Sequence, residues 1–377
     1  MVDAASVILR EVSDRRTLRR YIHLPEKLYR EYENWVPPIY ADEWRSNDSR
    51  HNPALTHSDV VRVLASLNGQ LVGRVMGIIN RKHNDQNNEQ TARFFQLDCV
   101  DDASVAHALL QFVEQWAKRH GMNKIIGPFG FSDKDPQGAQ IEGFEYLPVI
   151  ATPTNPPYLP GLIEGEGYEK EIDCVSYQIS LPEQIPHAIE RVFRRISRNP
   201  KLKLVECSTK RQIKPHIVPA LQLVNETFTG LLGFTPMSDQ EINKLSRQYL
   251  PILDPEFLKM VTDEKGRIAG FIVAIPDISR GIKEAKGKLW PFGFLRILAA
   301  QKKSDQLDLL LGAVHPELRG IGIDVLLGKA LIESAIRRKF KTLDSHLVLE
   351  TNRLMCTEYE KWGGEIYKRY RVYRKFL

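Results

Sequence analysis

The spacing of hydrophobic positions in the second half of the chain predicts a regular succession of helices and strands. Residues 307–314 form an apolar run of strand length, a glycine-containing turn follows, and a 3.6-residue periodicity begins at Val325. Upstream of this unit, two segments with helical periodicity precede two strand-like runs joined by a polar turn. The helical segments are 219–228 and 238–249, and the strand-like runs are 257–261 and 268–275. The chain therefore places helices first, then antiparallel strands, then a strand–turn–helix unit.

The turn at 319–324 (RGIGID) has the features of a phosphate-binding loop. It leads into a helix N-terminus, where backbone N–H groups are unpaired and the helix dipole is positive. Gly320 and Gly322 would let the backbone approach a phosphate closely. A dinucleotide fingerprint would require glycine at Val325, and a P-loop would require Ser or Thr at Ala330, so both are excluded. A strand-to-helix turn without a ligand is the remaining alternative.

Residues 314–327 (VHPELRGIGIDVLL) resemble the acetyl-CoA-binding motif R/Q-x-x-G-x-G/A of the GNAT superfamily of acyltransferases. Arg319 and Gly322 occupy its first two fixed positions, whereas Asp324 stands where the family has glycine or alanine. We expect Asp324 to cap the helix that follows. The resemblance implies acetyl-CoA or a longer acyl-CoA as co-substrate. The residues it implies in binding are Val314, Arg319, Gly320, Ile321, Gly322, Ile323, Asp324 and Asn352.

A second segment, ETNRLMCTEYEKWGGEIYKRYRVY, resembles the GNAT pattern N-x-x-A-x-x-x-Y-x-x-x-G-F and follows a strand-like run at 346–349. Asn352, Tyr359 and Gly363 have the spacing of this pattern, while Met355 and Gly364 depart from it. Asn352 and Tyr359 are two helical turns apart and share one face of a short helix. The resemblance implies that Tyr359 protonates the departing CoA thiolate as a general acid. The alternative is an aromatic side chain that anchors the last helix to the sheet.

The resemblance also implies a carboxylate base near the strand that precedes the turn. Asp308 lies in that strand among leucines, where burial would raise its pKa. Glu350, at the end of the next strand, is the competing candidate, and His315 is a further one. A strand-start position that faces water is an equal alternative for Asp308. The sequence leaves the identity of the base open.

The first half of the chain repeats the same order of elements. A hairpin, a third strand, a long amphipathic helix and a fourth strand are predicted at 60–67, 71–79, 93–97, 103–120 and 124–126. Acidic residues, including Asp102, stand before the helix in place of an R/Q-x-x-G-x-G turn. We predict an α/β (α+β) fold of two tandem GNAT-like domains of a bacterial type, each a mixed, largely antiparallel sheet flanked by helices, with a degenerate N-terminal copy. The predicted domains are 1–182 and 205–377, and a connector spans 183–204.

Composition supports a globular, non-membrane protein with room for two domains. The chain has 377 residues, of which 42% are hydrophobic and 27% charged. It begins without a signal-peptide pattern and has no apolar run of membrane-spanning length, so we expect a cytoplasmic location. The four cysteines lack the spacing of a zinc site; we expect reduced thiols and no metal.

The net charge of +6 raises the alternative of nucleic-acid binding, and two basic stretches, 191–203 and 367–376, would suit it. The first combines a helical pattern with a break at Asn199-Pro200, as a connector would. The second alternates like a final strand. Nucleic acid is therefore disfavoured as a partner.

The resemblance implies an acyl-CoA-dependent N-acyltransferase that acts on an amine acceptor. An insertion at 277–304 mixes aromatic and aliphatic residues with lysines and is predicted to be amphipathic, suited to a lipid surface or a long acyl chain. A helix packed on the sheet is its more ordinary interpretation. A lipid or long-chain amine is accordingly one candidate acceptor. The rival function is a non-catalytic regulatory or scaffold protein that binds acyl-CoA, for which Asp324 and Gly364 are the best arguments.

Overall fold

The computed structural model describes residues 6–185, 187–250 and 253–377. The first half of the chain folds in the predicted order, and its long helix ends as expected just before Gly121. Its elements are β1 (Ile8–Glu11), α1 (Arg15–Leu28), α2 (Tyr40–Ser46), β2 (Ser58–Leu67), β3 (Gln70–Asn80), α3 (Arg81–Asn87), β4 (Thr91–Cys99), α4 (Ala103–Arg119), β5 (Lys124–Gly127), β6 (Ala139–Glu142), α5 (Leu159–Gly165) and β7 (Glu169–Ser180).

The second half opens with the helix predicted for the connector and then repeats the order of the first. The inserted segment forms two helices between β10 and β11. The elements are α6 (His187–Ile196), β8 (Lys203–Glu206), α7 (Lys210–Thr227), α8 (Asp239–Tyr249), β9 (Leu258–Thr262), β10 (Ile268–Pro276), α9 (Ser279–Glu284), α10 (Gly293–Lys303), β11 (Gln306–Val314), α11 (Ile323–Arg337), β12 (Thr342–Asp344), β13 (Val348–Leu349), α12 (Arg353–Lys361) and β14 (Glu365–Phe376).

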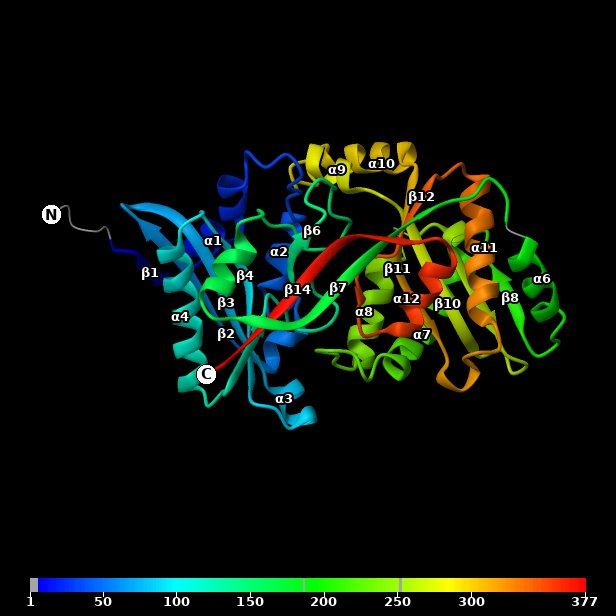
Figure 1. Ribbon diagram of the computed structural model, residues 1–377, viewed down its shortest axis with the longest axis horizontal. Coiled ribbons are helices and arrows are strands. Elements are labelled where there is room, and N and C mark those ends of the chain that lie inside the picture. The colour runs from blue at the N-terminus through cyan, green and yellow to red at the C-terminus, as the bar shows by residue number, and fades with distance from the viewer. Residues whose placement is uncertain (1–5, 186, 251–252) are drawn as a thin grey trace.

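The strands of both halves join in one continuous, mostly antiparallel sheet. Its order is β1-β2-β3-β4-β5-β14-β7-β12-β11-β10-β9-β8. The closing strand of each half has crossed into the other half: β14 pairs with β5, while β7 pairs with β12 and β13. The two closing strands also pair with each other along nearly their full lengths and run diagonally through the centre of Figure 1. The predicted domain boundaries stay a prediction, since neither half closes its own sheet.

Helices cover both faces of the sheet in each half (Figure 1). In the first half, α4 packs on one face of β2 and β3, and α1 and α2 pack on the other. In the second half, α7 and α8 cover one face of β9 and β10, and α11 covers the opposite face. Alternate strand residues therefore serve two separate cores, as Val261 and Met260 do on β9. The predicted α/β class is confirmed.

Of the two inserted helices, α9 has several buried residues, whereas α10 is mostly exposed and does not fit the more ordinary interpretation of a helix packed on the sheet. Within α10, Gly293 is the buried residue, and the helix rests on α9. The apolar side chains of α10 stay largely exposed because α9 lies between this helix and the rest of the molecule. The amphipathic interpretation of the insertion therefore fits the structure better.

Candidate active site

The glycine turn lies at the carboxyl end of β11 and opens directly into α11. Gly322 is the N-cap of this helix, with φ at +93°, and no side chain accepts a hydrogen bond from the first turn. Gly320 is also left-handed, with φ at +77°. Both conformations favour glycine and explain why the sequence has it at these two positions. The N–H groups at the start of α11 thus have no internal cap.

The expectation that Asp324 caps the helix is wrong. The helix starts at Ile323, one residue before Asp324, because the left-handed Gly322 takes the cap position. Asp324 instead sits exposed in the first turn, where a carboxylate interacts favourably with the helix dipole. On α12, Glu358 pairs with Lys361 at 2.6 Å and raises the pKa of Lys361, to which the charge of Asp324 adds a smaller contribution.

The equivalent helix of the first half has the opposite arrangement. Asp102 caps α4, and its carboxylate accepts a hydrogen bond from the Ser104 N–H at 2.8 Å. Nearby Asp98 pairs with Arg74 at 2.7 Å. The carboxylate of Asp102 therefore occupies the helix terminus that a phosphate would need. This is a physical reason for predicting that the N-terminal copy has lost its cofactor loop.

The other predicted binding residues lie around the turn in three different environments. Val314, at the end of β11, packs with buried Ile323 at the start of α11. Arg319 is exposed and its Nε donates to the Val314 carbonyl at 3.4 Å, while the Ile321 side chain is 43% exposed. Asn352 caps α12, accepting from the Met355 N–H at 3.4 Å.

Helix α6 covers one side of the turn. A Cβ atom on Gly322 would lie 2.1 Å from the Ile196 Cδ1 atom. Glu190 of α6 pairs with Lys329 of α11 at 3.4 Å, and the Lys329 ammonium lies 3.9 Å from the Phe193 ring centroid. The predicted connector is therefore a packed wall beside the turn.

Strands β11 and β12 separate well before β11 reaches this turn. They pair in parallel over three residues each, up to Asp308 and Asp344. The chain then leaves β12, with His346 left-handed at φ +59°, and the Ser345 N–H donates to the Tyr177 carbonyl on β7. The remainder of β11 keeps its pairing with β10 but has no further register with β12. The ladder between the two parallel strands therefore opens beyond Asp308, and we call this divergence the opening; the glycine turn follows the far end of β11.

Tyr359 lies on the α11 side of this opening. It packs against two apolar clusters, and its ring lies 5.5 Å from the Tyr177 ring centroid. Burial raises the pKa of its phenol, and the nearby charge of Asp344 adds to the effect, so the hydroxyl keeps its proton at neutral pH. A packed aromatic side chain with a protonated phenol suits both interpretations made from the sequence.

Asp308 and Asp344 lie side by side on the opposite face of the sheet and are both fully buried. The Asp308 Oδ1 accepts from the Gln306 amide at 2.8 Å, and its Oδ2 has no partner among the described residues. Burial, with Asp277 and Asp344 nearby, raises the pKa of Asp308 well above its usual value. The water-facing alternative for Asp308 is therefore wrong, whereas the expected direction of its pKa is confirmed.

Two residues of β14 complete this cluster, and sequence reasoning missed them together with Asp344. The Lys368 Nζ lies 3.6 Å from the Asp344 Oδ2, and both side chains are fully buried. The Lys368 ammonium also donates to the Leu147 carbonyl at 3.1 Å, and the Tyr367 hydroxyl donates to Asp344. One sequence feature pointed here: the run 367–376 alternates as a strand, so one of its two faces had to be buried.

Glu350 is engaged elsewhere. Its carboxylate pairs with Lys170 at 2.7 Å and accepts from the Asp173 N–H at 3.2 Å. Arg369 lies 4.0 Å away on the same surface. Glu350 therefore belongs to a surface ion-pair network, and no contact among the described residues joins it to Asp308 or Asp344.

We predict that Asp308→Asn raises the melting temperature at pH 8. The pKa of Asp308 is higher in the folded chain than in the unfolded chain. The unfolded chain therefore loses this proton at a lower pH. As the pH rises from the unfolded pKa to the folded pKa, the contribution of this carboxyl group to the free energy of unfolding falls. Asparagine removes this penalty and keeps the shape. Thermal unfolding from pH 4 to pH 8 should show the variant's advantage growing with pH; an advantage that shrinks with pH would contradict the shift.

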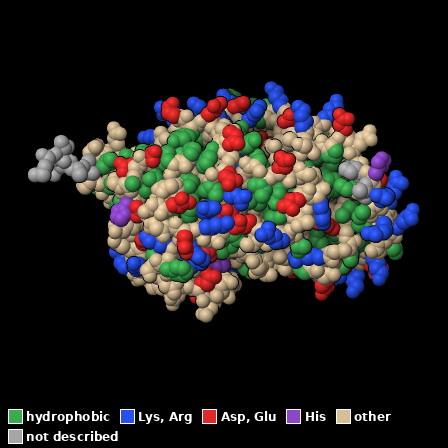
Figure 2. Space-filling view, in the orientation of Figure 1, with side chains coloured by type: hydrophobic (Ala, Val, Ile, Leu, Met, Phe, Trp, Pro, Cys, Tyr) green, Lys and Arg blue, Asp and Glu red, His purple; other side chains and the backbone are tan. Residues whose placement is uncertain are grey.

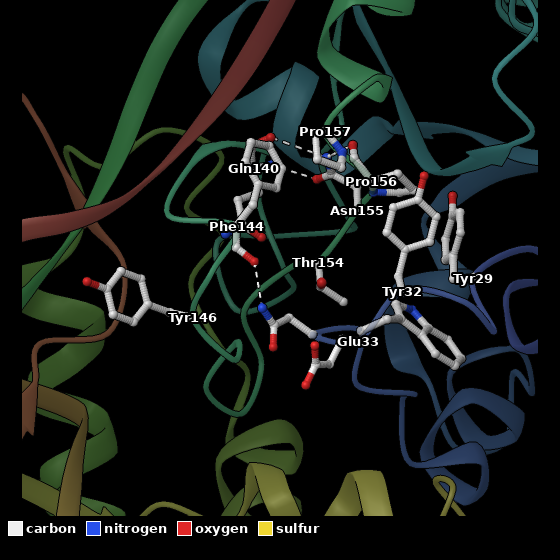
Figure 3. A pocket seen from close by; sticks show the side chains of 12 residues that line it. Tyr29, Tyr32, Glu33, Gln140, Phe144, Tyr146, Thr154, Asn155, Pro156 and Pro157 are labelled. Carbon is white, nitrogen blue, oxygen red and sulfur yellow. Dashed lines mark hydrogen bonds between the residues drawn. The ribbon is translucent and has the colours of Figure 1, made fainter.

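Two cavities lie near the loop that follows β6. The first, of about 160 Å³, is lined mostly by aromatic and proline side chains, among them Tyr29, Tyr32 and Pro156 (Figure 3). Asn34 closes one side, donating to the Phe144 carbonyl at 2.9 Å. Tyr146 stands apart from the aromatic group and also lines the second cavity.

The second cavity, of about 470 Å³, is polar and is built by both halves of the chain. Its wall includes Tyr367, whose hydroxyl reaches Asp344, and Gly363 of the second sequence motif. The carboxylates at its rim belong to Glu142, Glu145 and Glu365. Glu142 pairs with Arg369 at 3.3 Å, which leaves Glu145 and Glu365 without an ion pair among the described residues, and the Tyr367 hydroxyl links the cavity wall to the buried Asp344.

Comparisons with known proteins agree with this architecture. No family model matches the chain. A tandem GNAT protein from the clavulanic acid biosynthesis pathway superimposes over 98% of both chains with a TM-score of 0.54 at 15% identity. A GCN5-related glucosamine N-acetyltransferase region of a fungal multi-domain β-N-acetylglucosaminidase gives a TM-score of 0.54 at 11% identity, over 99% of this chain and 38% of the other.

Two curated proteins are similar over nearly their whole lengths. Protein YghO of Escherichia coli is 29% identical over 375 residues, 98% of this chain and 95% of that protein. A bacterial ceramide synthase of Caulobacter vibrioides is 27% identical over 368 residues, 96% of this chain and 95% of that protein.

The chain has the tandem GNAT fold, and the resemblance seen in the two sequence motifs is confirmed at that level. None of the helices in the described ranges is long and apolar enough to cross a bilayer. The four cysteines are free and buried, and the described residues hold no group of His, Cys, Asp and Glu suited to a metal ion.

Proposed function

We propose that the protein is an acyl-CoA-dependent N-acyltransferase that transfers an acyl group to an amine. The observation that carries this proposal is the combination of an uncapped glycine turn with the opening between β11 and β12. In the first half the corresponding helix is capped by Asp102, so the second half holds the cofactor. The diphosphate of acyl-CoA would be bound by backbone N–H groups of residues 321–324.

The polar cavity that Tyr367 lines is the proposed acceptor site. An amine is largely an ammonium ion at neutral pH, and Glu145 and Glu365 at the rim favour its entry. Attack on the thioester requires the neutral amine. In the proposed path the amine gives a proton to the Tyr367 oxygen while the Tyr367 hydroxyl proton passes to Asp344. The buried carboxylates thus act through a hydrogen bond and need no direct contact with the acceptor.

Acyl-CoA supplies the acyl group as a thioester. The nitrogen–carbon bond forms as the carbon–sulfur bond breaks, and the Tyr359 hydroxyl donates its proton to the departing sulfur. The second proton that the nitrogen loses as the amide forms passes to water, and water returns a proton to the Tyr359 phenolate. Tyr359 and the pair Asp308 and Asp344 lie on opposite faces of the sheet. The proposed acid, Tyr359, and the proposed base therefore lie on either side of the opening between the strands. This arrangement suits direct transfer of the acyl group, in which the amine approaches the thioester from one side and the thiolate is protonated from the other.

A long-chain amine of a lipid is the proposed acceptor class. The similarity to a protein named bacterial ceramide synthase supports it, since a ceramide is the amide of a long-chain amino alcohol. The exposed apolar insertion beside β11 supports it independently.

Replacement of each tyrosine by phenylalanine tests the two proton transfers. Tyr359→Phe and Tyr367→Phe should each lower turnover about 100-fold or more, as loss of a general acid or base does, and should leave the calorimetric Kd for acyl-CoA nearly unchanged. Free CoA is measured with short and long-chain amines. Tyr32→Phe, in the separate aromatic cavity, is the control.

The outcomes separate the enzyme from its rival. Absence of binding to both acetyl-CoA and a long-chain acyl-CoA would exclude the cofactor site. Binding without release of CoA for any amine would favour the non-catalytic acyl-CoA-binding protein. A normal rate for Tyr359→Phe would assign that side chain a packing role alone.

A further inference from the structure

Positive charge is concentrated in the α9–α10 platform, which we define as residues 279–303. This segment contains seven Lys and Arg residues and one Glu, a net charge of +6. The whole chain has 53 Lys and Arg against 47 Asp and Glu, which is also +6, so the remaining residues balance at 46 against 46. The platform is thus one of two strongly basic segments; the other, residues 191–203, also carries six cations and no carboxylate.

The same platform exposes a cluster of large apolar side chains. Trp290 is 81% exposed, Phe292 67%, Leu295 50%, Leu298 47% and Phe294 40%. Phe294, Leu295 and Leu298 share one face of α10 because they are three and four residues apart. An exposed aromatic and aliphatic group of this density on a folded protein marks an interaction surface.

The platform packs closely against the rest of the molecule, so its side chains are not exposed merely because the segment lacks contacts. A Cβ atom on Gly281 of α9 would lie 2.6 Å from the Ile297 Cα, which shows how closely α10 rests on α9. The Tyr40 N–H donates to the Gly287 carbonyl at 3.0 Å, and Lys288 lies 3.8 Å from Glu26. Both helices form the upper edge of the molecule in Figure 1 and lie over the junction of the two halves.

Four of the seven cations of the platform are exposed and free to meet an anionic partner. Arg280, Lys286, Lys302 and Lys303 are exposed and form no ion pair within the part of the chain that the structure describes. In the space-filling view, basic side chains project from the upper edge of the molecule, where α10 lies (Figure 2). Lys302 follows Leu298 by one helical turn, so the charge borders the apolar face directly.

We propose that the α9–α10 platform docks the protein on the surface of an anionic lipid bilayer. Tryptophan and phenylalanine partition into the interfacial region, and flanking Lys and Arg bind anionic headgroups. A second copy of this chain is disfavoured as the occupant, since self-association through this face would oppose +6 to +6. The inference does not rest on the proposed function.

Docking would place the lipid next to the buried carboxylates. The platform begins two residues after Asp277, whose carboxylate accepts from the Ser279 N–H at 2.9 Å. The charge of Asp277 also contributes to the raised pKa of Asp308. An acceptor that left the bilayer at this edge would therefore reach the sheet near β11.

Vesicle flotation with the full-length protein tests the proposal. We expect binding to vesicles of phosphatidylcholine and phosphatidylglycerol at 3:1 and 0.1 M NaCl, and little binding to phosphatidylcholine alone or in 0.5 M NaCl. Lys302→Gln/Lys303→Gln should weaken binding about 25-fold, about fivefold for each cation. Arg211→Gln/Lys214→Gln is the matched control, because it removes two exposed cations from α7.

A second measurement locates the contact. Brominated lipids should quench tryptophan fluorescence in the wild type, and Trp290→Phe should remove most of the quenching while flotation persists. The proposal would be overturned if Lys302→Gln/Lys303→Gln and Arg211→Gln/Lys214→Gln bound the anionic vesicles equally well. It would also be overturned if the wild-type protein did not bind the anionic vesicles. If the wild-type protein dimerised in a concentration-dependent way without vesicles, and Phe292→Ser/Leu298→Ser did not, the surface would be assigned to contact with a second copy of the chain. Calorimetry with acyl-CoA on the same variants should be unchanged, so a failure here leaves the cofactor site untouched.

Discussion

A chain that ends at Gly364, and so lacks β14, is expected to lose the cooperative folding of both halves. The missing strand carries Tyr370, Val372 and Tyr373, all fully buried, and Tyr373 belongs to the core of the first half. Loss of each large buried side chain costs about 3–5 kcal/mol, so the sum is comparable to the ~5–15 kcal/mol by which a domain is normally stable, before the lost strand pairing is counted. Circular dichroism should show no cooperative thermal transition.

Removal of residues 1–12 is the matched control, since β1 is an edge strand with mostly exposed side chains. This variant should keep a single transition. Tyr373→Ala tests the same point without truncation and should lower the stability of the first half by about 3–5 kcal/mol. Persistence of a trypsin-resistant first half in the chain that ends at Gly364 would show that β14 is dispensable there and would contradict the expected coupling.

Lys368→Met is expected to be the most destabilising single substitution in the buried polar cluster. It leaves the Asp344 charge without its cation at 0% exposure, and loss of one partner of a buried ion pair costs about 3–5 kcal/mol. The Leu147 carbonyl also loses its donor. Urea unfolding at pH 7.5 measures the loss.

Adding Asp344→Asn to Lys368→Met should recover part of the stability, because the uncompensated charge is then gone. Lys375→Met is the matched control on the same strand: its ion pair with Glu114, at 2.9 Å, is partly exposed, and the loss should stay within about 1 kcal/mol. A Lys368→Met variant as stable as Lys375→Met would mean that the buried pair of Lys368 and Asp344 contributes no more to stability than an exposed pair.

Local pattern was enough to predict the elements that carry the cofactor side of the site. The strand at 306–314, the turn with Gly320 and Gly322, and α12 with Tyr359 lie where the sequence places them. Each depends on neighbours in the chain, through hydrophobic period or backbone conformation. The wrong prediction of a cap at Asp324 shows the limit of prediction from local pattern. A shift of one residue in the start of a helix changes which residue lies at the N-cap and can accept hydrogen bonds from the N–H groups of the first turn.

The base side of the site depends on contacts between distant segments and could not be predicted in the same way. Lys368 reaches the carbonyl of Leu147, 221 residues earlier. Asp344 lies in a strand of three residues, too short to show a period. The crossing of β7 and β14 likewise cannot be predicted from local sequence. A strand shows the same alternation of buried and exposed side chains whichever strands it pairs with.

The crossing of the closing strands also fixes the order in which the protein can mature. When a ribosome has completed residues 1–182, the sheet of the first half still lacks the strand that lies between β5 and β7. That strand consists of residues 365–376, which are synthesised after the other elements of the second half. The edge of β5 therefore stays unpaired while the second half is synthesised, and during that interval it is open to pairing with other chains. Neither half can complete its part of the sheet until this one strand has been made.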